Sequence, residues 1–273
     1  MENILLKKIP TLVATLTVLV LGPSIVHAKT LCTVVIDSLT ATKVIMQGEC
    51  NNRVTPASTF KISLAAMGYN EGILKDAHNP IIPFRDGYPD WGGPDWKQPT
   101  DPERWLKYSV VWYSQQITHR LGAEKLADYV KRFDYGNADV SGDPGKNNGL
   151  ERAWIASSLK ISPFEQVRFL SRLLNGTLPI SNEAMTRTIA LVETLDETPD
   201  GWTIHGKTGT AYPRRADGSF DQSMAWGWYV GWAEKDGHCV IFARLIQDEK
   251  FEKSSAGVRA RESLLKDMPR LLK

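Results

Sequence analysis

Several patterns that mark common protein functions are missing from this sequence. Its 273 residues contain no CxxC pair and no histidine spacing suited to metal ligands, so we predict no metal site. The formal net charge is only +2 and there is no basic tract, so neither a nucleic acid nor a membrane surface is an expected partner. No internal repeat occurs. The 42% hydrophobic content is typical of a folded globular protein.

The apolar run near the N-terminus is too short for a membrane span. It covers residues 9–21, a length of 13, whereas a transmembrane helix needs about 20 residues. Lys7 and Lys8 precede it, and a small-residue stretch ending at Ala28 follows. This order predicts a secretory signal peptide over residues 1–28, cleaved after Ala28, and no stable membrane insertion. We expect one mature domain over residues 29–273.

Three cysteines, Cys32, Cys50 and Cys239, would then be in an oxidising compartment. Cys32 and Cys50 flank a predicted hairpin, so a disulfide between them is one possibility. The odd number of cysteines leaves the pairing open.

Strand-like runs at the two ends of the chain enclose a helical middle. Residues 31–37 and 42–47 are predicted to form a hairpin, and three more strand-like runs lie between residues 202 and 247. Residues 255–271 carry the pattern of a final amphipathic helix. The predicted fold is mixed α/β, a five-stranded antiparallel sheet built from both chain ends and flanked by helices. An all-helical sub-domain is inserted over approximately residues 65–195.

Residues 79–102 interrupt the helical region. Their prolines and glycines, among them Gly92-Gly93-Pro94, are too turn-rich for regular structure. We expect a long ordered loop able to form one wall of a cleft between the sheet and the helices.

The spacing S-x-x-K occurs three times, at Ser58/Lys61, Ser157/Lys160 and Ser263/Lys266. The second pair lies ahead of a helix that is predicted to begin at a Ser162 cap. Ser157 and Lys160 are therefore not on a helix, and their spacing does not bring the two side chains together. The third lies on the solvated face of the last helix, where a lysine stays protonated and cannot act as a base.

Ser58 and Lys61 differ in both respects. Pro56 fits a first helical turn capped by Thr55, and the residues that follow are apolar almost all round, as in a buried helix. Three positions apart, the two side chains share a helix face. Burial and the positive helix N-terminus disfavour the ammonium form of Lys61, so its neutral amine could act as a base for the Ser58 hydroxyl. The alternative is a helix-start serine followed by a lysine that extends to solvent.

Four further motifs follow along the chain: Ser109-Val110-Val111, Tyr135-Gly136-Asn137, Trp154 ahead of a serine-rich loop, and Lys207-Thr208-Gly209. S-x-x-K followed by K-T-G is shared by penicillin-recognising serine enzymes. With all five motifs in order, nearly the whole mature chain resembles the class D β-lactamases, the oxacillinases. The sequence lacks the Ser-Asp-Asn motif and the catalytic glutamate of the class A enzymes, which agrees with a resemblance to class D.

The resemblance implies a periplasmic serine β-lactamase that hydrolyses penicillin-type antibiotics and confers resistance. Ser58 would form the acyl-enzyme. Lys61, carbamylated by CO2 to N6-carboxylysine, would be the general base, and no bound cofactor is implied. Trp154 would donate its indole N–H to the carbamate, and Val111 would keep that pocket apolar while contributing to the substrate site.

The resemblance also implies how the substrate is held. Ser109 would relay a proton to the departing nitrogen, and the backbone N–H groups of Ser58 and Thr210 would form the oxyanion hole. The residues expected to hold the substrate carboxylate are Lys207, which also counts as catalytic, Thr208, Gly209, Thr210 and an arginine. The family pattern matches Arg259, whereas a helical wheel places Arg261 on the apolar side, so Arg259 is our prediction and Arg261 the alternative. Tyr135-Gly136-Asn137 is expected mainly to support the cleft edge.

Other functions would use many of the same residues. A D,D-peptidase would release β-lactams slowly, and a non-hydrolytic β-lactam sensor would be attached to a membrane-signalling segment. A Ser-His-Asp esterase lacks its G-x-S-x-G elbow here. The expected partner is a small β-lactam molecule, bound by a monomer or a homodimer, with a substrate spectrum that residue types do not reveal.

Overall fold

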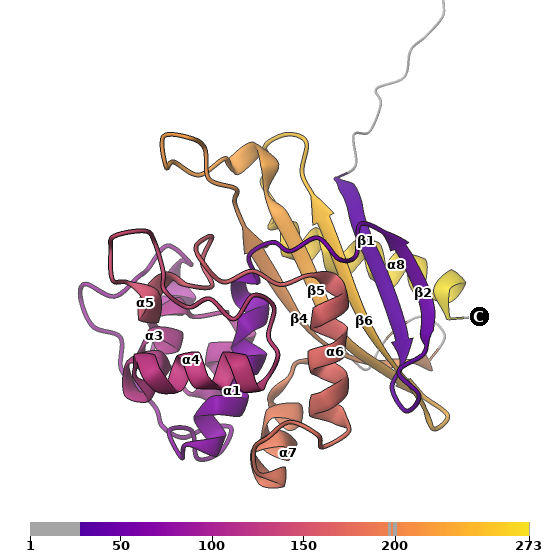
Figure 1. The fold of residues 1–273 in the computed structure, drawn as a ribbon, viewed down its shortest axis with the longest axis horizontal. Helices are drawn as coiled ribbons and strands as arrows, with labels where there is room; N and C mark the ends of the chain where they lie inside the picture. The colour runs from indigo at the N-terminus through magenta and orange to yellow at the C-terminus, as the bar shows by residue number, and fades with distance from the viewer. Residues whose placement is uncertain (1–27, 196–197, 199–200, 273) are drawn as a thin grey trace, which may run out of the picture.

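The computed structural model describes residues 28–195, 198 and 201–272, so the predicted signal peptide lies outside it except for Ala28. The described strands form one antiparallel sheet (Figure 1), with the spatial order β2-β1-β6-β5-β4-β3. The strands are β1 (Lys29–Asp37), β2 (Lys43–Gly48), β3 (Thr194–Leu195), β4 (Thr203–Ala211), β5 (Trp226–Lys235) and β6 (His238–Gln247). Because β1 pairs with β6, the sheet joins both chain ends, as predicted.

The sheet has six strands, not the five that the sequence predicts. The additional strand is β3, whose two residues Thr194 and Leu195 pair with His205 and Ile204 of β4. Two residues are too few to show the alternation of polar and apolar side chains by which a strand is recognised.

Helices cover both faces of the sheet and fill one side of the molecule (Figure 1). They are α1 (Phe60–Asn70), α2 (Pro102–Lys107), α3 (Val111–Leu121), α4 (Ala123–Arg132), α5 (Gly149–Arg152), α6 (Pro163–Leu174), α7 (Asn182–Leu191) and α8 (Ala256–Leu271), with 3₁₀ turns η1 (Ala57–Thr59), η2 (Pro94–Lys97) and η4 (Gln222–Met224). α8 packs on β4, β5 and β6, and α6 packs on the opposite face against β1, β5 and β6. In the described part of the chain, no helix combines the length and apolarity needed to cross a membrane.

Helix α1 is buried on all sides, as its composition predicts. Every residue from Phe60 to Tyr69 is buried, so the helix runs through the core between the sheet and the other helices. The predicted cap was wrong in detail. Thr55 makes no capping bond, because its hydroxyl donates to the Trp154 carbonyl at 2.9 Å and accepts the Ala156 N–H at 3.0 Å. The short turn η1 precedes the helix instead.

Residues 79–102 form an ordered loop with little regular structure, as predicted. Ile82 and Thr100 pair across its base. The indole N–H of Trp96 donates to the Tyr108 carbonyl at 2.9 Å, and that of Trp112 donates to the Trp96 carbonyl at 2.8 Å. The loop is therefore attached to the segment that carries Ser109 and Val111.

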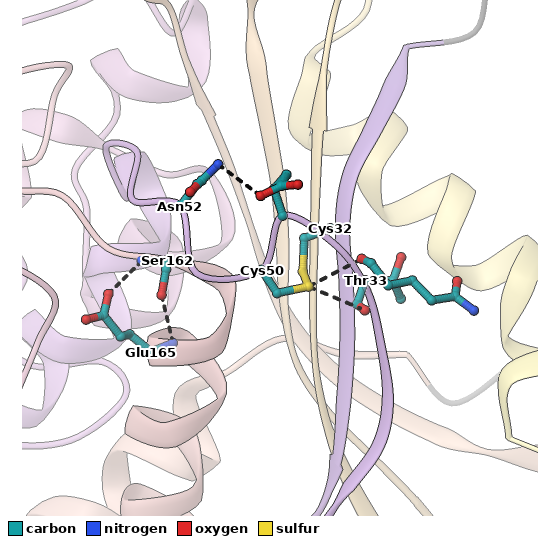
Figure 2. Close-up of a disulfide and its surroundings, with 8 residues drawn as sticks. Cys32, Thr33, Cys50, Asn52, Ser162 and Glu165 are labelled. Carbon is teal, nitrogen blue, oxygen red and sulfur yellow. Dashed lines mark hydrogen bonds between the residues drawn. A yellow bond between two sulfur atoms is a disulfide. The ribbon is translucent and has the colours of Figure 1, made fainter.

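Cys32 and Cys50 form a disulfide, which resolves the pairing that the sequence left open, and Cys239 is free (Figure 2). Cys50 follows β2, and its carbonyl accepts the Phe164 N–H of α6 at 3.0 Å. The predicted capping box of Ser162 and Glu165 is present at that helix end. The disulfide and α6 together fix the start of the segment that leads from the sheet to Ser58.

We expect replacement of both cysteines, Cys32→Ala with Cys50→Ala, to lower the free energy of unfolding by about 3 kcal/mol. The bond joins residues 18 apart, and closing a loop of this length restricts the unfolded chain by roughly that amount. Urea unfolding of the two proteins measures the difference. Dithiothreitol should destabilise the wild type alone; equal sensitivity of both proteins would contradict the assignment.

Candidate active site

The nucleophile candidate Ser58 lies in a tight turn held by two segments distant in sequence. The preceding residue, Ala57, has φ +51°, a left-handed conformation that a non-glycine residue rarely adopts. Its N–H donates to the Trp154 carbonyl at 3.1 Å. On the inner side, the buried amide of Gln166 donates to the Thr59 hydroxyl at 2.7 Å. These bonds keep the strained turn, and with it Ser58, in one orientation.

Lys61 is entirely buried, with its Nζ 3.1 Å from the Oγ of Ser58. Burial lowers the pKa of its amine well below 10.5, and the nearby positive charge of Lys207 lowers it further. This shift favours the neutral amine over the ammonium form. The structure brings together the S-x-x-K pair that the sequence selected, and a neutral amine in this position could act as a base.

Trp154 provides an unused hydrogen-bond donor in the same buried region. Its ring packs against Phe60, the neighbour of Lys61, with the centroids 5.7 Å apart. The indole N–H is buried and has no hydrogen-bond partner. A buried donor without an acceptor costs about 1–3 kcal/mol, so such an atom marks a place for an additional acceptor. Val111, 6% exposed, belongs to the apolar core cluster that also contains Trp154.

Lys207 links the sheet to the helical part of the site. It lies on β4, is 3% exposed, and donates from Nζ to Ser109 Oγ at 2.6 Å and to the Thr208 carbonyl at 3.0 Å. Burial lowers the pKa of its amine to about 8. Ser109 has φ +56°, which places it at a bend between α2 and α3. A lysine with this pKa, next to a hydroxyl, can exchange a proton near neutral pH.

The K-T-G strand runs directly against the turn that carries Ser58. A Cβ atom on Gly209 would lie 3.1 Å from the Pro56 carbonyl oxygen and 3.3 Å from the Ser58 nitrogen, so this close approach favours glycine. The next residue, Thr210, has its hydroxyl 2.7 Å from that of Ser255 and accepts the Gly257 N–H at 2.8 Å. The two predicted oxyanion donors, the N–H groups of Ser58 and Thr210, thus belong to segments in contact, and Thr208 lies between Lys207 and Gly209 on the same strand.

Both candidate arginines lie in the first half of α8. The helix begins at Ala256, so Arg259 is in its first turn. Its Nη2 donates to Oδ1 of Asp248 at 2.6 Å, and its Nη1 donates to Oγ of Ser254 at 3.0 Å. The charge of Arg261 lowers the pKa of Lys207, which places Arg261 near β4 as well. Asp248 belongs to no motif and was missed by sequence reasoning.

Tyr135-Gly136-Asn137 supports the segment that follows Trp154. Gly136 has φ +61°, and a Cβ there would lie 2.0 Å from the Lys160 carbonyl oxygen. The Asn137 side chain donates to the Ser158 carbonyl at 2.8 Å and accepts the Lys160 N–H at 2.9 Å. These contacts fit the architectural role proposed for the motif.

His78, Asp101 and Glu103 form a cluster at the surface that the spacing of these residues in the sequence did not predict. His78 Nδ1 lies 3.1 Å from a carboxylate oxygen of Asp101 and 3.7 Å from one of Glu103. The hydrogen bond to Asp101 raises the pKa of His78. The group holds together the two ends of the 79–102 loop.

Comparison with known proteins agrees with this geometry. Residues 31–269 match the family described as the penicillin-binding protein transpeptidase domain. β-Lactamase OXA-9 of Klebsiella pneumoniae is 42% identical over 242 residues, 88% of this chain and 88% of that protein. β-Lactamase OXA-1 of Escherichia coli is 33% identical over 220 residues, 80% and 76% of the two chains. The crystal structure of the class D β-lactamase OXA-427 aligns with a TM-score of 0.81 at 47% identity, covering 88% of this chain and 98% of that one.

The chain belongs to the penicillin-binding protein transpeptidase family and, within it, to the class D β-lactamases of the oxacillinase type. It is a serine β-lactamase, of a class associated with antibiotic resistance, and this membership implies no metal cofactor.

Burial of Lys61 should make stability depend on pH. Its pKa is lower in the folded chain than in the unfolded chain, so the unfolded chain binds a proton that the folded one lacks. Wild-type stability should therefore fall as the pH drops from about 10.5 towards the folded pKa. Lys61→Met, whose unbranched side chain is uncharged and one atom shorter, should be more stable than the wild type at pH 7, with the difference shrinking near pH 10.

Urea unfolding in bicarbonate-free buffer between pH 6 and 10 measures this difference. Lys266→Met, at an exposed position of α8, serves as the control and should show no such pH dependence. A constant difference between the Lys61 variant and the wild type at all pH values would show that the amine is not buried.

Proposed function

We propose that this β-lactamase forms an acyl-enzyme on Ser58 and uses carbamylated Lys61 as its general base. The observation that carries the proposal is the fully buried Lys61 amine at 3.1 Å from Ser58 Oγ, whose pKa burial lowers well below 10.5. Only a neutral amine adds CO2, forming an N–C bond and losing a proton to give a carbamate. The unpartnered Trp154 N–H is a donor available to such an anion.

Each step of acylation would have a group to perform it. The carbamate on Lys61 would supply an oxygen base that accepts the Ser58 proton. Ser58 Oγ attacks the β-lactam carbonyl carbon, and the N–H groups of Ser58 and Thr210 stabilise the oxyanion. As the C–N bond breaks, Ser109 gives its proton to the ring nitrogen and regains one from Lys207, at 2.6 Å.

Substrate orientation depends on the positive side of the site. Lys207 and Arg259 would hold the β-lactam carboxylate, together with Thr208, Gly209 and Thr210 on β4, and Val111 would line the pocket. Deacylation then requires a base for water. The class A glutamate is absent from the sequence, and Lys61 would take that role once its carbamate has released the proton taken from Ser58, which replaces the proton that Lys207 gave to Ser109. The same residue would then serve both half-reactions.

We further propose that the chain is exported to the periplasm and loses residues 1–28, and that it acts as a monomer or a homodimer. A sensor or a D,D-peptidase would be acylated at the same serine. The difference between these functions and a β-lactamase is the rate of deacylation, which is the quantity that the experiments below measure.

Removal of CO2 should inactivate the enzyme reversibly. Purified 29–273 protein in degassed buffer at mildly acidic pH should lose most of its penicillin turnover, and bicarbonate should restore it, because the carbamate forms and decomposes reversibly. ¹³C-Bicarbonate should give a carbamate NMR signal that is absent in Lys61→Met.

Ser58→Ala is the matched control for this experiment. It should abolish both covalent labelling by penicillin and hydrolysis while keeping the carbamate signal. Stoichiometric acylation without turnover in the wild type would favour a sensor or a peptidase. Turnover unaffected by the loss of CO2 would refute the carbamate, and turnover by Ser58→Ala would refute the serine mechanism.

Trp154→Phe should slow deacylation more than acylation, because the carbamate would lose its indole donor while the ring packing is largely kept. We expect a decrease in the deacylation rate of roughly tenfold or more, the loss typical of one charge-assisted hydrogen bond. Mass spectrometry should then detect a persistent acyl-enzyme. Bicarbonate at high concentration should rescue part of the loss.

Trp232→Phe is the control for the lost volume, since Trp232 is equally buried but lies on β5 and stacks on His205. It should turn over penicillin at nearly the wild-type rate. Equal deacylation rates in the two variants would mean that Trp154 has only a packing role.

A further inference from the structure

Asp248 is a buried carboxylate directly after the end of β6. Its side chain is 2% exposed, and its N–H donates to the Ala225 carbonyl at 2.9 Å, which fixes the backbone at this point. The side chain forms an ion pair with Arg259, which is itself 19% exposed. Burial of a carboxylate is costly unless a cation neutralises it, so Asp248 strongly restricts where the guanidinium can lie.

The guanidinium of Arg259 is oriented by both of its terminal nitrogens. Nη2 donates to Asp248, and Nη1 donates to the hydroxyl and the carbonyl of Ser254. The Nε atom is buried, and its hydrogen has no partner. A guanidinium has five N–H donors, and the four on the terminal nitrogens face Asp248 and Ser254, so a further acceptor would share these N–H groups in bifurcated bonds.

The position of Arg259 in α8 brings this pair to the substrate strand. Two residues earlier, Gly257 is packed so closely that a Cβ would lie 2.7 Å from the Gly209 carbonyl oxygen. The Gly257 N–H also donates to Thr210. The first turn of α8 is thus rigidly attached to β4. Asp248 fixes the direction in which the Arg259 side chain extends from α8.

We propose that Asp248 is a positioning residue for Arg259 and lowers the KM for β-lactams by holding the guanidinium ready for the substrate carboxylate. The inference rests on the proposed function, in which Arg259 binds that carboxylate. A free arginine side chain loses much rotamer freedom when it binds, and an arginine already held by Asp248 avoids that loss. Asp248 itself does not contact the substrate.

The test compares kcat and KM of wild type and Asp248→Asn with a penicillin in bicarbonate buffer. Asparagine keeps the shape and one acceptor but removes the charge. We expect KM to rise roughly tenfold and kcat to stay within about twofold of the wild-type value. The reason is that the Asp248–Arg259 ion pair would favour the contact between Arg259 and the substrate carboxylate equally in the ground state and in the transition state. In an Arg259→Ala background, the same Asp248→Asn change should alter KM less than about twofold.

A second pair between β6 and α8 supplies the matched control. Arg244, 3% exposed, donates to Asp267 at 2.8 Å and has no motif residue as a neighbour in the chain. Asp267→Asn should lower thermal stability and leave KM within about twofold of wild type. If Asp248→Asn does not fold, Asp248→Glu keeps the charge but displaces the guanidinium by one methylene, and it should raise KM in the same direction.

An unchanged KM in the folded Asp248 variants would overturn the inference, as would an equal rise in the Arg259→Ala background. If Arg259→Ala alone leaves KM unchanged while turnover continues, the inference fails and the Ser58–Lys61 mechanism stands. If the wild type is acylated but does not turn over, the proposed function fails. In that case, the acylation rate constants of the same variants test the Asp248 assignment directly. We expect Asp248→Asn to weaken acylation at low substrate concentration by the same factor of roughly ten.

Discussion

Burial of the Lys61 amine without a counter-charge is the constraint on which the rest of this site depends. An isolated ammonium group in the core would be very costly, so burial lowers the pKa of the amine and favours its neutral form. Such burial requires a helix that is apolar on every side, and α1 has that composition from Phe60 to Tyr69. The surrounding apolar core stabilises this arrangement, which places the amine 3.1 Å from Ser58 Oγ.

The second requirement is close approach of three segments that are far apart in the sequence. The turn before Ser58, the backbone at Trp154 and the strand at Gly209 meet within hydrogen-bonding or van der Waals distance. The disulfide and α6 fix the path of the chain into this turn. The strained φ of Ala57 is maintained because the Trp154 carbonyl accepts the Ala57 N–H and the strand at Gly209 packs against the turn.

The two halves of the molecule divide the chemistry between them. The helical half contributes Ser58, Lys61 and Ser109, the groups proposed to transfer protons. The sheet and α8 contribute the cations that would hold an anionic substrate, with Lys207 connecting the halves through its bond to Ser109. Class membership establishes the activity of the chain, and the proposed roles would give the buried amine to the helical half and the substrate-binding cations to the sheet and α8.

Much of this arrangement is determined by the sequence itself. Apolar residues all round α1 distinguish Ser58/Lys61 from the other two S-x-x-K pairs, and alternating runs at both chain ends predict a sheet that joins them. These features depend on local composition and spacing, which a single segment contains. The capping box at Ser162 was predicted for the same reason.

Tertiary structure alone decided the rest. The two-residue strand β3 exists only because β4 is beside it, and Thr55 binds the Trp154 segment instead of capping a helix. The pairing of Arg259 with Asp248 joins residues from a strand end and a helix start, which no spacing along the chain predicts. Contacts of this kind arise when distant segments are packed together, because burial then requires each polar group to find a partner wherever the fold provides one.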